Sequence, residues 1–374
     1  MKPGRRAFFL PRLAAATPWA NFCQRLARAA QGRVDDDTPA PGAPGRARLR
    51  VARDEDVFHA RALCAELGVM LVLPGADPAL LPPDRHWLIL DVDALNTLGP
   101  VDLAQGHIDI DVGCTFGMLR QALAGTGWTW PHGDDGATVA SWMAAPGPWR
   151  PGHCRDSGLR WADVMLAGGE FERLGPFGVD ATRPLRSAAS SRLISSLFEL
   201  SGASSMQTLL AQPTWLAAYR LDALTPRSDE RPDDAVQADD ALAGAAQQGI
   251  AAREGAALQG TAARAGADAQ GRVAPGADAL APNPAHLLLG SRGTLAWTGR
   301  VQLQLLRDAP AGSDPSRSSK NHPAASPGPA TTPATAATEA SAAIPPVRRH
   351  VLDDLDDMVK GCFDPLGLFP SQVV

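Results

Sequence analysis

The chain lacks several features that would assign it to a class at once. Its 374 residues include only five cysteines and no C-x-x-C pair, so neither a disulfide framework nor a zinc site follows from the spacing. Aromatic residues make up 5% of the chain, with a single tyrosine. There is no run of about eighteen apolar residues, so no membrane-spanning helix is predicted. These absences favour a reducing compartment, and the expected location is the cytoplasm.

The charge pattern gives no sign of a nucleic-acid partner. The formal net charge is −5, with both signs interspersed and no basic stripe. At the amino terminus, Arg5 and Arg6 precede a short apolar stretch, and two interpretations stay open. One is a twin-arginine export signal. The other, favoured because Pro11 and Arg12 interrupt the stretch, is a basic arm with a short amphipathic helix around Trp19–Ala30. Such a helix could dock on a partner, or on the inner face of a membrane as a peripheral attachment.

Glycine and proline are abundant, at 36 and 33 residues, and much of the excess falls in two tracts. Residues 226–284 are rich in alanine and glycine but lack large apolar residues at helical spacing. Residues 310–346 form a Pro/Ser/Thr/Ala linker. The predicted organisation is therefore a basic arm with a short helix (1–45), a first folded part (46–225), a low-complexity insertion (226–284), closing strands (285–309), a linker (310–346) and a C-terminal helix with a tail (347–374).

Strand and helix signals alternate over the first folded part. Asp54 is the expected cap of a helix that ends at Gly68, and a strand at Val69–Leu73 follows. Thr115 is expected to cap a second helix after a strand with Ile108 and Ile110 on one face. The pattern predicts an α+β fold.

Two segments near the carboxyl end carry the most specific patterns. The first, HLLLGSRGTLAWTGRVQLQLL, spans 286–306 and turns at Gly290-Ser291-Arg292-Gly293 into an alternating strand. The second, VKGCFDPLGLFP, spans 359–370 and ends an amphipathic helix. On that helix we expect Leu352, Leu355, Val359 and Cys362 to face the core and Asp353, Asp354, Asp356 and Asp357 to face solvent.

Both segments resemble signature regions of the flavin-dependent oxidases and dehydrogenases that share the p-cresol methylhydroxylase/vanillyl-alcohol oxidase (PCMH/VAO) type of FAD-binding domain. Residues 108–127, 136–147 and 154–175 resemble further segments of that family in the same order. The resemblance implies two mixed α/β subdomains with FAD between them. The family's substrate region is truncated here, because the linker 310–346 takes its place.

The resemblance also implies which residues line the cofactor. They fall in three loops and are Pro74, Gly75 and Ala76, then Thr138, Ala140 and Ser141, then Gly290 and Gly293. Small residues let the backbone approach a diphosphate, whose charge clustered N–H groups bind. The first loop departs most from the family, since it keeps one glycine of three and carries Asp77. It contains no histidine for covalent attachment, so noncovalent FAD is expected. No metal site is predicted.

Two functions from different classes remain. With a flavin domain and a closing tail but no full substrate domain, the chain is similar in shape to the family of FAD-binding subunits of glycolate oxidase, which implies hydride transfer from a small hydroxy acid such as glycolate or D-lactate to FAD. Its partners would be a second flavin subunit and an iron–sulfur subunit. The alternative is a non-catalytic structural or assembly subunit that retains the fold. No catalytic residue is assigned: His132, His153, His286, Arg150 and Arg155 are expected to be ordinary loop residues, and Trp128, Trp130, Trp142 and Trp149 packing residues.

Overall fold

The computed structural model describes residues 17–77, 81–178, 181, 183–227, 281–308 and 347–371. Nearly all of the insertion 226–284 lies outside these ranges, as do residues 1–16, which include Arg5 and Arg6, and the linker 310–346. The elements in chain order are α1 (Pro18–Ala29), β1 (Arg33–Asp36), β2 (Arg46–Arg50), α2 (Asp54–Leu67), β3 (Met70–Val72), β4 (Trp87–Asp91), β5 (His107–Asp111), α3 (Phe116–Leu123), β6 (Trp128–Thr129), α4 (Val139–Ala144), η2 (Cys154–Ser157), β7 (Leu159–Met165), β8 (Phe171–Leu174), α5 (Ala188–Ser201), α6 (Ser204–Leu210), η4 (Leu221–Leu224), η5 (Pro284–Leu288), β9 (Trp297–Gln304), β10 (Leu306–Arg307) and α8 (Arg349–Phe363).

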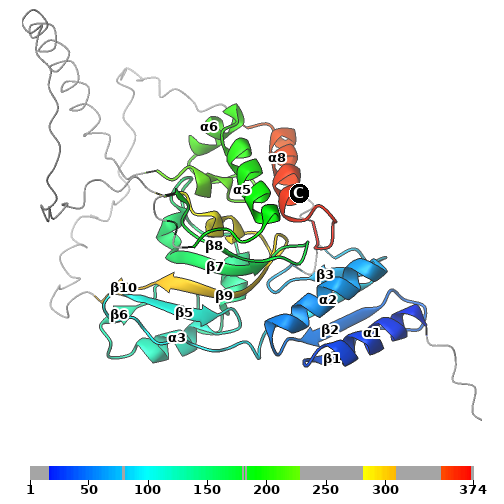
Figure 1. Ribbon diagram of the computed structural model, residues 1–374. Coiled ribbons are helices and arrows are strands. Elements are labelled where there is room, and N and C mark those ends of the chain that lie inside the picture. Colours follow the sequence, from blue (N-terminus) through cyan, green and yellow to red (C-terminus); the bar gives the residue numbers. More distant parts are fainter. Residues whose placement is uncertain are drawn as a thin grey trace, which may run out of the picture.

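The architecture is α+β, as the sequence predicts, with two mixed subdomains side by side (Figure 1). The first is a sheet in the order β1-β2-β4-β3, in which β4 runs parallel to both β2 and β3. Helix α2 begins at the N-cap Arg53, so Asp54 is its first residue and not its cap, contrary to expectation. It ends at Gly68 as expected, because this glycine adopts the left-handed conformation at φ 64°.

Helix α1 belongs to this first subdomain. Its apolar residues Phe22 and Leu26 are fully buried, and the ring of Trp19 stacks on Phe22 and on His86. The following strand β1 pairs antiparallel with β2. The apolar face of this helix, which the sequence offered as a possible docking face, therefore packs against the chain itself.

The second subdomain depends on a strand from far along the sequence. Its sheet has the order β5-β9-β7-β8, and β9, which follows the long insertion, lies between two strands that precede it. Val301 of β9 is opposite Ile110 of β5 and Ala162 of β7, and all three side chains are buried. The strand that the alternating pattern at 301–305 predicts is therefore confirmed. Thr115 caps α3 as expected, accepting the N–H of Met118.

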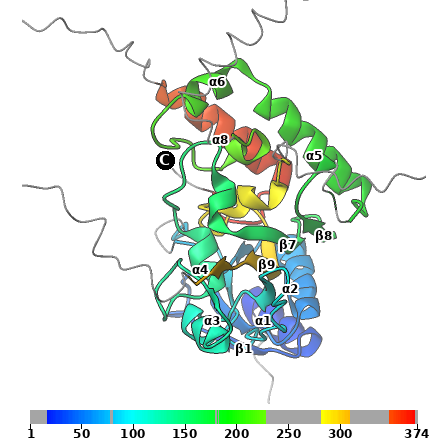
Figure 2. The same cartoon turned by 90° about the vertical axis from the view of Figure 1, so that its left-hand side faces the viewer.

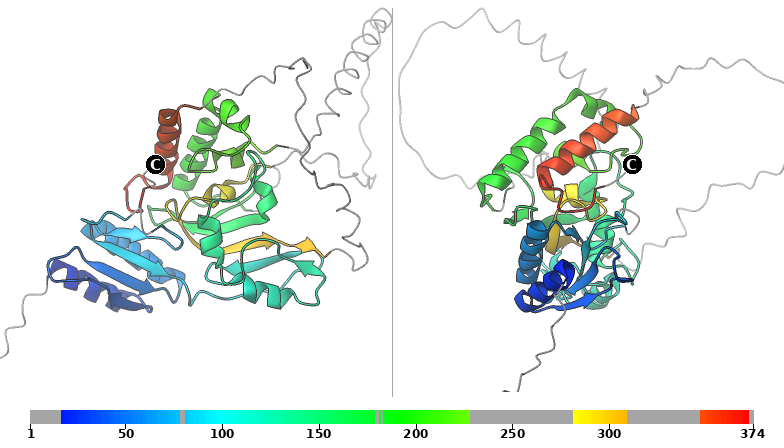
Figure 3. Two further views of the ribbon diagram at one scale, coloured as in Figure 1. Left: turned by 180° about the vertical axis from the view of Figure 1, so that it is seen from behind. Right: turned by 90° about the vertical axis from the view of Figure 1, so that its right-hand side faces the viewer.

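A helical layer covers the second subdomain. Helices α5, α6 and α8 lie above its sheet, with α8 close to α5 (Figures 2 and 3). Leu355 and Val359 of α8 are buried, as expected. The polar face of α8 differs from the expectation in one respect: Asp356 is buried too, because its carboxylate accepts the backbone N–H groups of Ala218 and Tyr219. The amphipathic pattern of this helix predicts its polar face, but it does not show that one carboxylate of that face will bind a neighbouring loop.

Candidate functional site

The three predicted cofactor loops meet at the junction between the two subdomains. The first follows β3, the second contains α4 with its N-cap Thr138, and the third precedes β9. A methyl group placed on Gly75 would lie 2.5 Å from Cβ of Ala144 and 3.0 Å from the carbonyl oxygen of Ala140. One placed on Gly293 would lie 2.8 Å from the carbonyl oxygen of Pro74. Segments more than 200 residues apart in the sequence thus come into contact at this junction.

The backbone donors of these loops bind the protein itself. Gly290 donates its N–H to the carbonyl oxygen of Met143 (2.7 Å), and Arg292 donates to that of Ala144 (3.0 Å). Ala76 donates to Leu73 within its own turn (3.2 Å). The hydroxyl of Thr138 accepts the N–H of Ser141 as the cap of α4. These N–H groups are therefore not pointing together at one anion, as a diphosphate cradle requires.

The space between the loops is also small. The cavity bounded by Pro74, Ala140, Ala144 and Gly293 has a volume of about 30 Å³. Pockets for drug-sized ligands are roughly ten times larger. With these donors paired and the loops in contact, the cavity between Pro74, Ala140, Ala144 and Gly293 does not fit the diphosphate of FAD.

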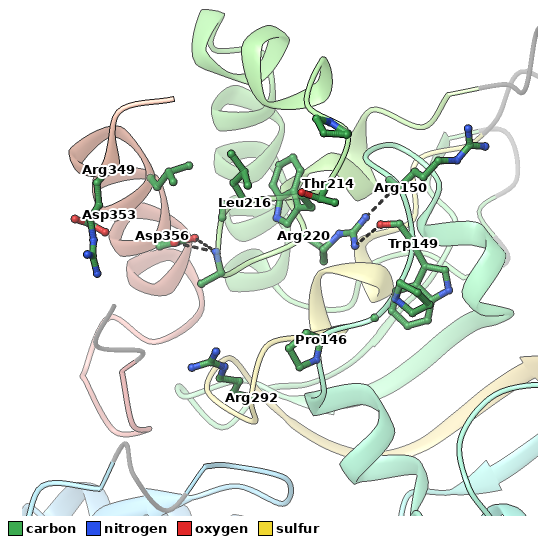
Figure 4. Close-up of a pocket in the computed structure, with 18 residues that line it drawn as sticks. Pro146, Trp149, Arg150, Thr214, Leu216, Arg220, Arg292, Arg349, Asp353 and Asp356 are labelled. Atoms are coloured by element: carbon green, nitrogen blue, oxygen red, sulfur yellow. Dashed lines mark hydrogen bonds between the residues drawn. The ribbon is translucent and has the colours of Figure 1, made fainter. Parts of the chain in front are cut away.

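A larger pocket of about 380 Å³ opens beside the junction (Figure 4). Its walls are the loop 146–150, the segment 213–220 and the first turns of α8. Arg220 holds two of these walls together: its guanidinium donates to the carbonyl oxygens of Trp149 and Arg150 (3.1 Å each) and pairs with Asp222 (2.7 Å). Asp356 joins the third wall, α8, to the segment 213–220, because its carboxylate accepts the N–H groups of Ala218 and Tyr219. Burial raises the pKa of Asp356 to about 6.

Arg292 lies between the junction and this pocket. Its φ of 51° makes it the one non-glycine residue with positive φ in the part of the chain that the structure describes. Such a conformation costs about 1–3 kcal/mol and persists where surrounding contacts enforce it. Here the hydrogen bond from Arg292 N–H to Ala144 enforces it, since that bond fastens the closing loop to α4.

The candidate histidines do not converge on the junction. His132 packs among Trp130, Trp142 and Trp149, where burial lowers its pKa. His286 is fully buried in η5, its Nε2 bonded to the carbonyl oxygen of Leu159 (2.7 Å), and burial lowers its pKa to about 4. His153 is buried in the turn before η2.

The candidate arginines are similarly dispersed. Arg150 lines the pocket in Figure 4, whereas Arg155 lines a separate groove with His286. The structure therefore brings the cofactor loops together but gives no catalytic grouping of these residues.

The tryptophans serve mainly as packing residues, as expected. Trp130 and Trp149 are buried, and Trp130 stacks on Phe116. Trp128 is buried under the guanidinium of Arg307, 4.5 Å from its ring centre. Cys64 is a core residue too.

The residues that build the pocket in Figure 4 were not found from the sequence. Segment 175–226 has no family motif, so nothing marked Arg220 and Asp222 as a buried ion pair. The one available signal was local: an arginine and an aspartate two residues apart within the apolar stretch AAYRLDAL. Because buried charges are rare unless paired, this stretch is the signal from which a structural pair could have been inferred.

Comparisons with known proteins give structural similarity alone. No family model matches the chain, and no curated protein matches it. The chain is similar to the solved 4-ethylphenol oxidase from Gulosibacter chungangensis (TM-score 0.40, 14% identity, 80% of this chain and 45% of that one). It is also similar to p-cresol methylhydroxylase (0.38, 11%, 78% and 44%) and to alkyldihydroxyacetonephosphate synthase (0.36, 12%, 71% and 32%). The chain spans less than half the length of each.

The described residues contain neither a membrane-spanning helix nor a cluster of metal-binding side chains. No helix among them is long and apolar enough to cross a bilayer. No group of three or more His, Cys, Asp or Glu side chains in these same residues is arranged to hold a metal ion.

Proposed function

We propose that this chain is a non-catalytic structural or assembly subunit that retains the architecture of a flavin-binding domain. The observation that carries the proposal is the closed junction. Gly75 contacts Ala140 and Ala144 directly, and only about 30 Å³ remains between the loops. A cofactor that must lie between these loops has no room there unless they separate.

The chemistry of the first loop supports the same conclusion. Pro74 has no N–H to donate, the N–H of Ala76 is used within the turn, and Asp77 adds a negative charge to the loop. A diphosphate carries two negative charges, so a carboxylate nearby opposes its binding.

The test is the flavin content of the purified protein. We expect no absorption band near 450 nm, and no saturable binding when FAD is added in an equilibrium titration. Stoichiometric flavin in the purified protein, or tight binding of added FAD, would overturn the proposal. Measuring after overexpression with riboflavin supplementation makes a negative result independent of cofactor supply.

The second candidate is a flavin subunit of a 2-hydroxy-acid dehydrogenase complex. It is favoured by one observation, the convergence of all three predicted loops at a single junction. In this function the loops separate to admit noncovalent FAD, which accepts the hydride. A second flavin subunit and an iron–sulfur subunit complete the complex, in the cytoplasm or at the inner face of the membrane. Bleaching of a flavin band by glycolate or D-lactate without oxygen would establish it.

A further inference from the structure

A groove of about 830 Å³ lies on the second subdomain, away from the junction. Strands β7, β8 and β9 contribute to its wall, together with η2 and the start of η5. Four arginines line it, Arg155, Arg160, Arg173 and Arg183, and none of its described lining residues is Asp or Glu. Its size lies within the range of small-molecule sites, roughly 300–1,000 Å³.

Two of these guanidinium groups are held in place. Arg173 makes a two-point contact with the carboxylate of Asp163 (2.7 and 2.6 Å), and its guanidinium carbon lies 3.4 Å from the ring centre of Trp161. Its charge is therefore compensated. Arg160 is half-buried and donates to the side-chain oxygen of Gln304 (3.0 Å), which is neutral. The guanidinium of Arg160 is thus held in one orientation, and among the described residues it has no carboxylate partner that offsets its charge.

The other two arginines add further charge. In the described part of the chain, Arg183 makes neither a hydrogen bond nor an ion pair through its side chain, and it is exposed. The carboxylate nearest Arg155 is that of Asp156, at 3.8 Å, and both side chains are largely exposed. Surface pairs of this kind contribute little. Positive charge thus exceeds negative charge along the groove.

The wall behind the arginines is rigid and neutral. Asn283 is buried and donates to the carbonyl oxygen of Arg160 (2.9 Å), which fixes the backbone there. His286 beside it is buried and carries no charge near neutral pH, since burial lowers its pKa to about 4. A guanidinium held ready before binding loses less freedom when it meets an anion.

We propose that this groove binds a small molecule with at least two negatively charged oxyanion groups, either phosphates or carboxylates. Guanidinium groups match both in geometry and form charge-assisted hydrogen bonds with them. Arg160, Arg183 and Arg155 make the contacts, while Arg173 supports the wall. The site is separate from the junction and does not depend on whether the chain holds FAD.

The experiment is isothermal titration calorimetry of the full chain with pyrophosphate and with citrate, at ionic strength matched with sodium chloride. We expect saturable binding of at least one probe. Arg160→Gln combined with Arg183→Gln should weaken it about tenfold or more, as the loss of hydrogen bonds to charged groups implies. Binding of pyrophosphate alone assigns phosphate, and binding of citrate alone assigns carboxylate.

The matched control is Arg85→Gln combined with Arg192→Gln, which removes two exposed arginines elsewhere. It changes the net charge equally and should leave the affinity unchanged. Arg183→Gln alone tests an exposed position and keeps the Arg160–Gln304 contact, so a loss of affinity there cannot be attributed to misfolding. The proposal is overturned if neither probe binds, or if the control pair weakens binding as much as the groove pair.

Discussion

Lys360 and Asp364 form a buried ion pair in which the ammonium lies 2.8 Å from the carboxylate. The same ammonium donates to the carbonyl oxygen of Thr294 in the closing loop (2.6 Å). Asp364 in turn accepts the N–H groups of Leu368 and Phe369, and the carbonyl oxygen of Leu368 accepts the N–H of Leu71 in β3. One pair therefore fastens the carboxyl tail to both subdomains.

Removing the carboxylate of this pair should destabilise the fold strongly. Asp364→Asn leaves the ammonium of Lys360 buried without a counter-charge, which typically costs about 3–5 kcal/mol. The free energy of unfolding from urea titrations measures this. Asp357→Asn, at an exposed position of the same helix, should change it by less than about 0.5 kcal/mol. Equal effects of the two variants would show that the pair has no special role.

Much of the fold could be predicted from the sequence because its signals are local. The alternation at 301–305, the cap at Thr115 and the left-handed Gly68 each depend on a few neighbouring residues, and each is confirmed. The contacts that Asp356 and Arg220 make with Ala218, Trp149 and Arg150 could not be predicted, since these partners are distant in sequence. The same limit applies to the junction. Sequence indicated which loops meet, but whether they leave room for a ligand depends on packing between them.

Two glycine-to-alanine changes should have opposite effects on stability. In Gly293→Ala the new methyl lies 2.8 Å from the carbonyl oxygen of Pro74, at a φ of 62° that alanine disfavours. We expect a loss of about 2 kcal/mol or more. In Gly361→Ala the methyl meets nothing within 4 Å inside α8, so helix propensity should add about 1 kcal/mol. Thermal unfolding of both variants tests the prediction, which fails if Gly293→Ala is neutral.

His286 should make stability depend on pH. Its pKa is about 4 in the folded chain, against the ordinary histidine pKa of 6.5, so between these values the unfolded chain binds more protons. Stability is therefore complete above about pH 6.5 and falls as the pH drops towards 4, by about 3 kcal/mol in total.

His286→Asn isolates this contribution, because asparagine can donate a hydrogen bond but does not titrate. We expect the variant to lose less stability than the wild type between pH 7 and pH 4.5, as measured by urea unfolding. The comparison cancels other groups, including Asp356, whose raised pKa acts in the opposite direction. Parallel pH profiles for the two proteins would contradict the assignment.

Reopening the junction should raise the affinity for FAD. In the combined variant Ala76→Gly, Asp77→Gly and Ala144→Gly, the first two changes restore glycines and remove a carboxylate that opposes the diphosphate. The third removes the methyl group against which Gly75 packs. Loss of one like charge at close range is worth about 1 kcal/mol in water, and the space gained adds to it, so saturable binding of FAD should appear in the variant. Quenching of flavin fluorescence measures the affinity, with Asp84→Gly as the control that removes a carboxylate from the same connection. If the combined variant binds FAD no better than the wild type, Pro74–Asp77 is not a phosphate loop, and the structural role of the chain gains support.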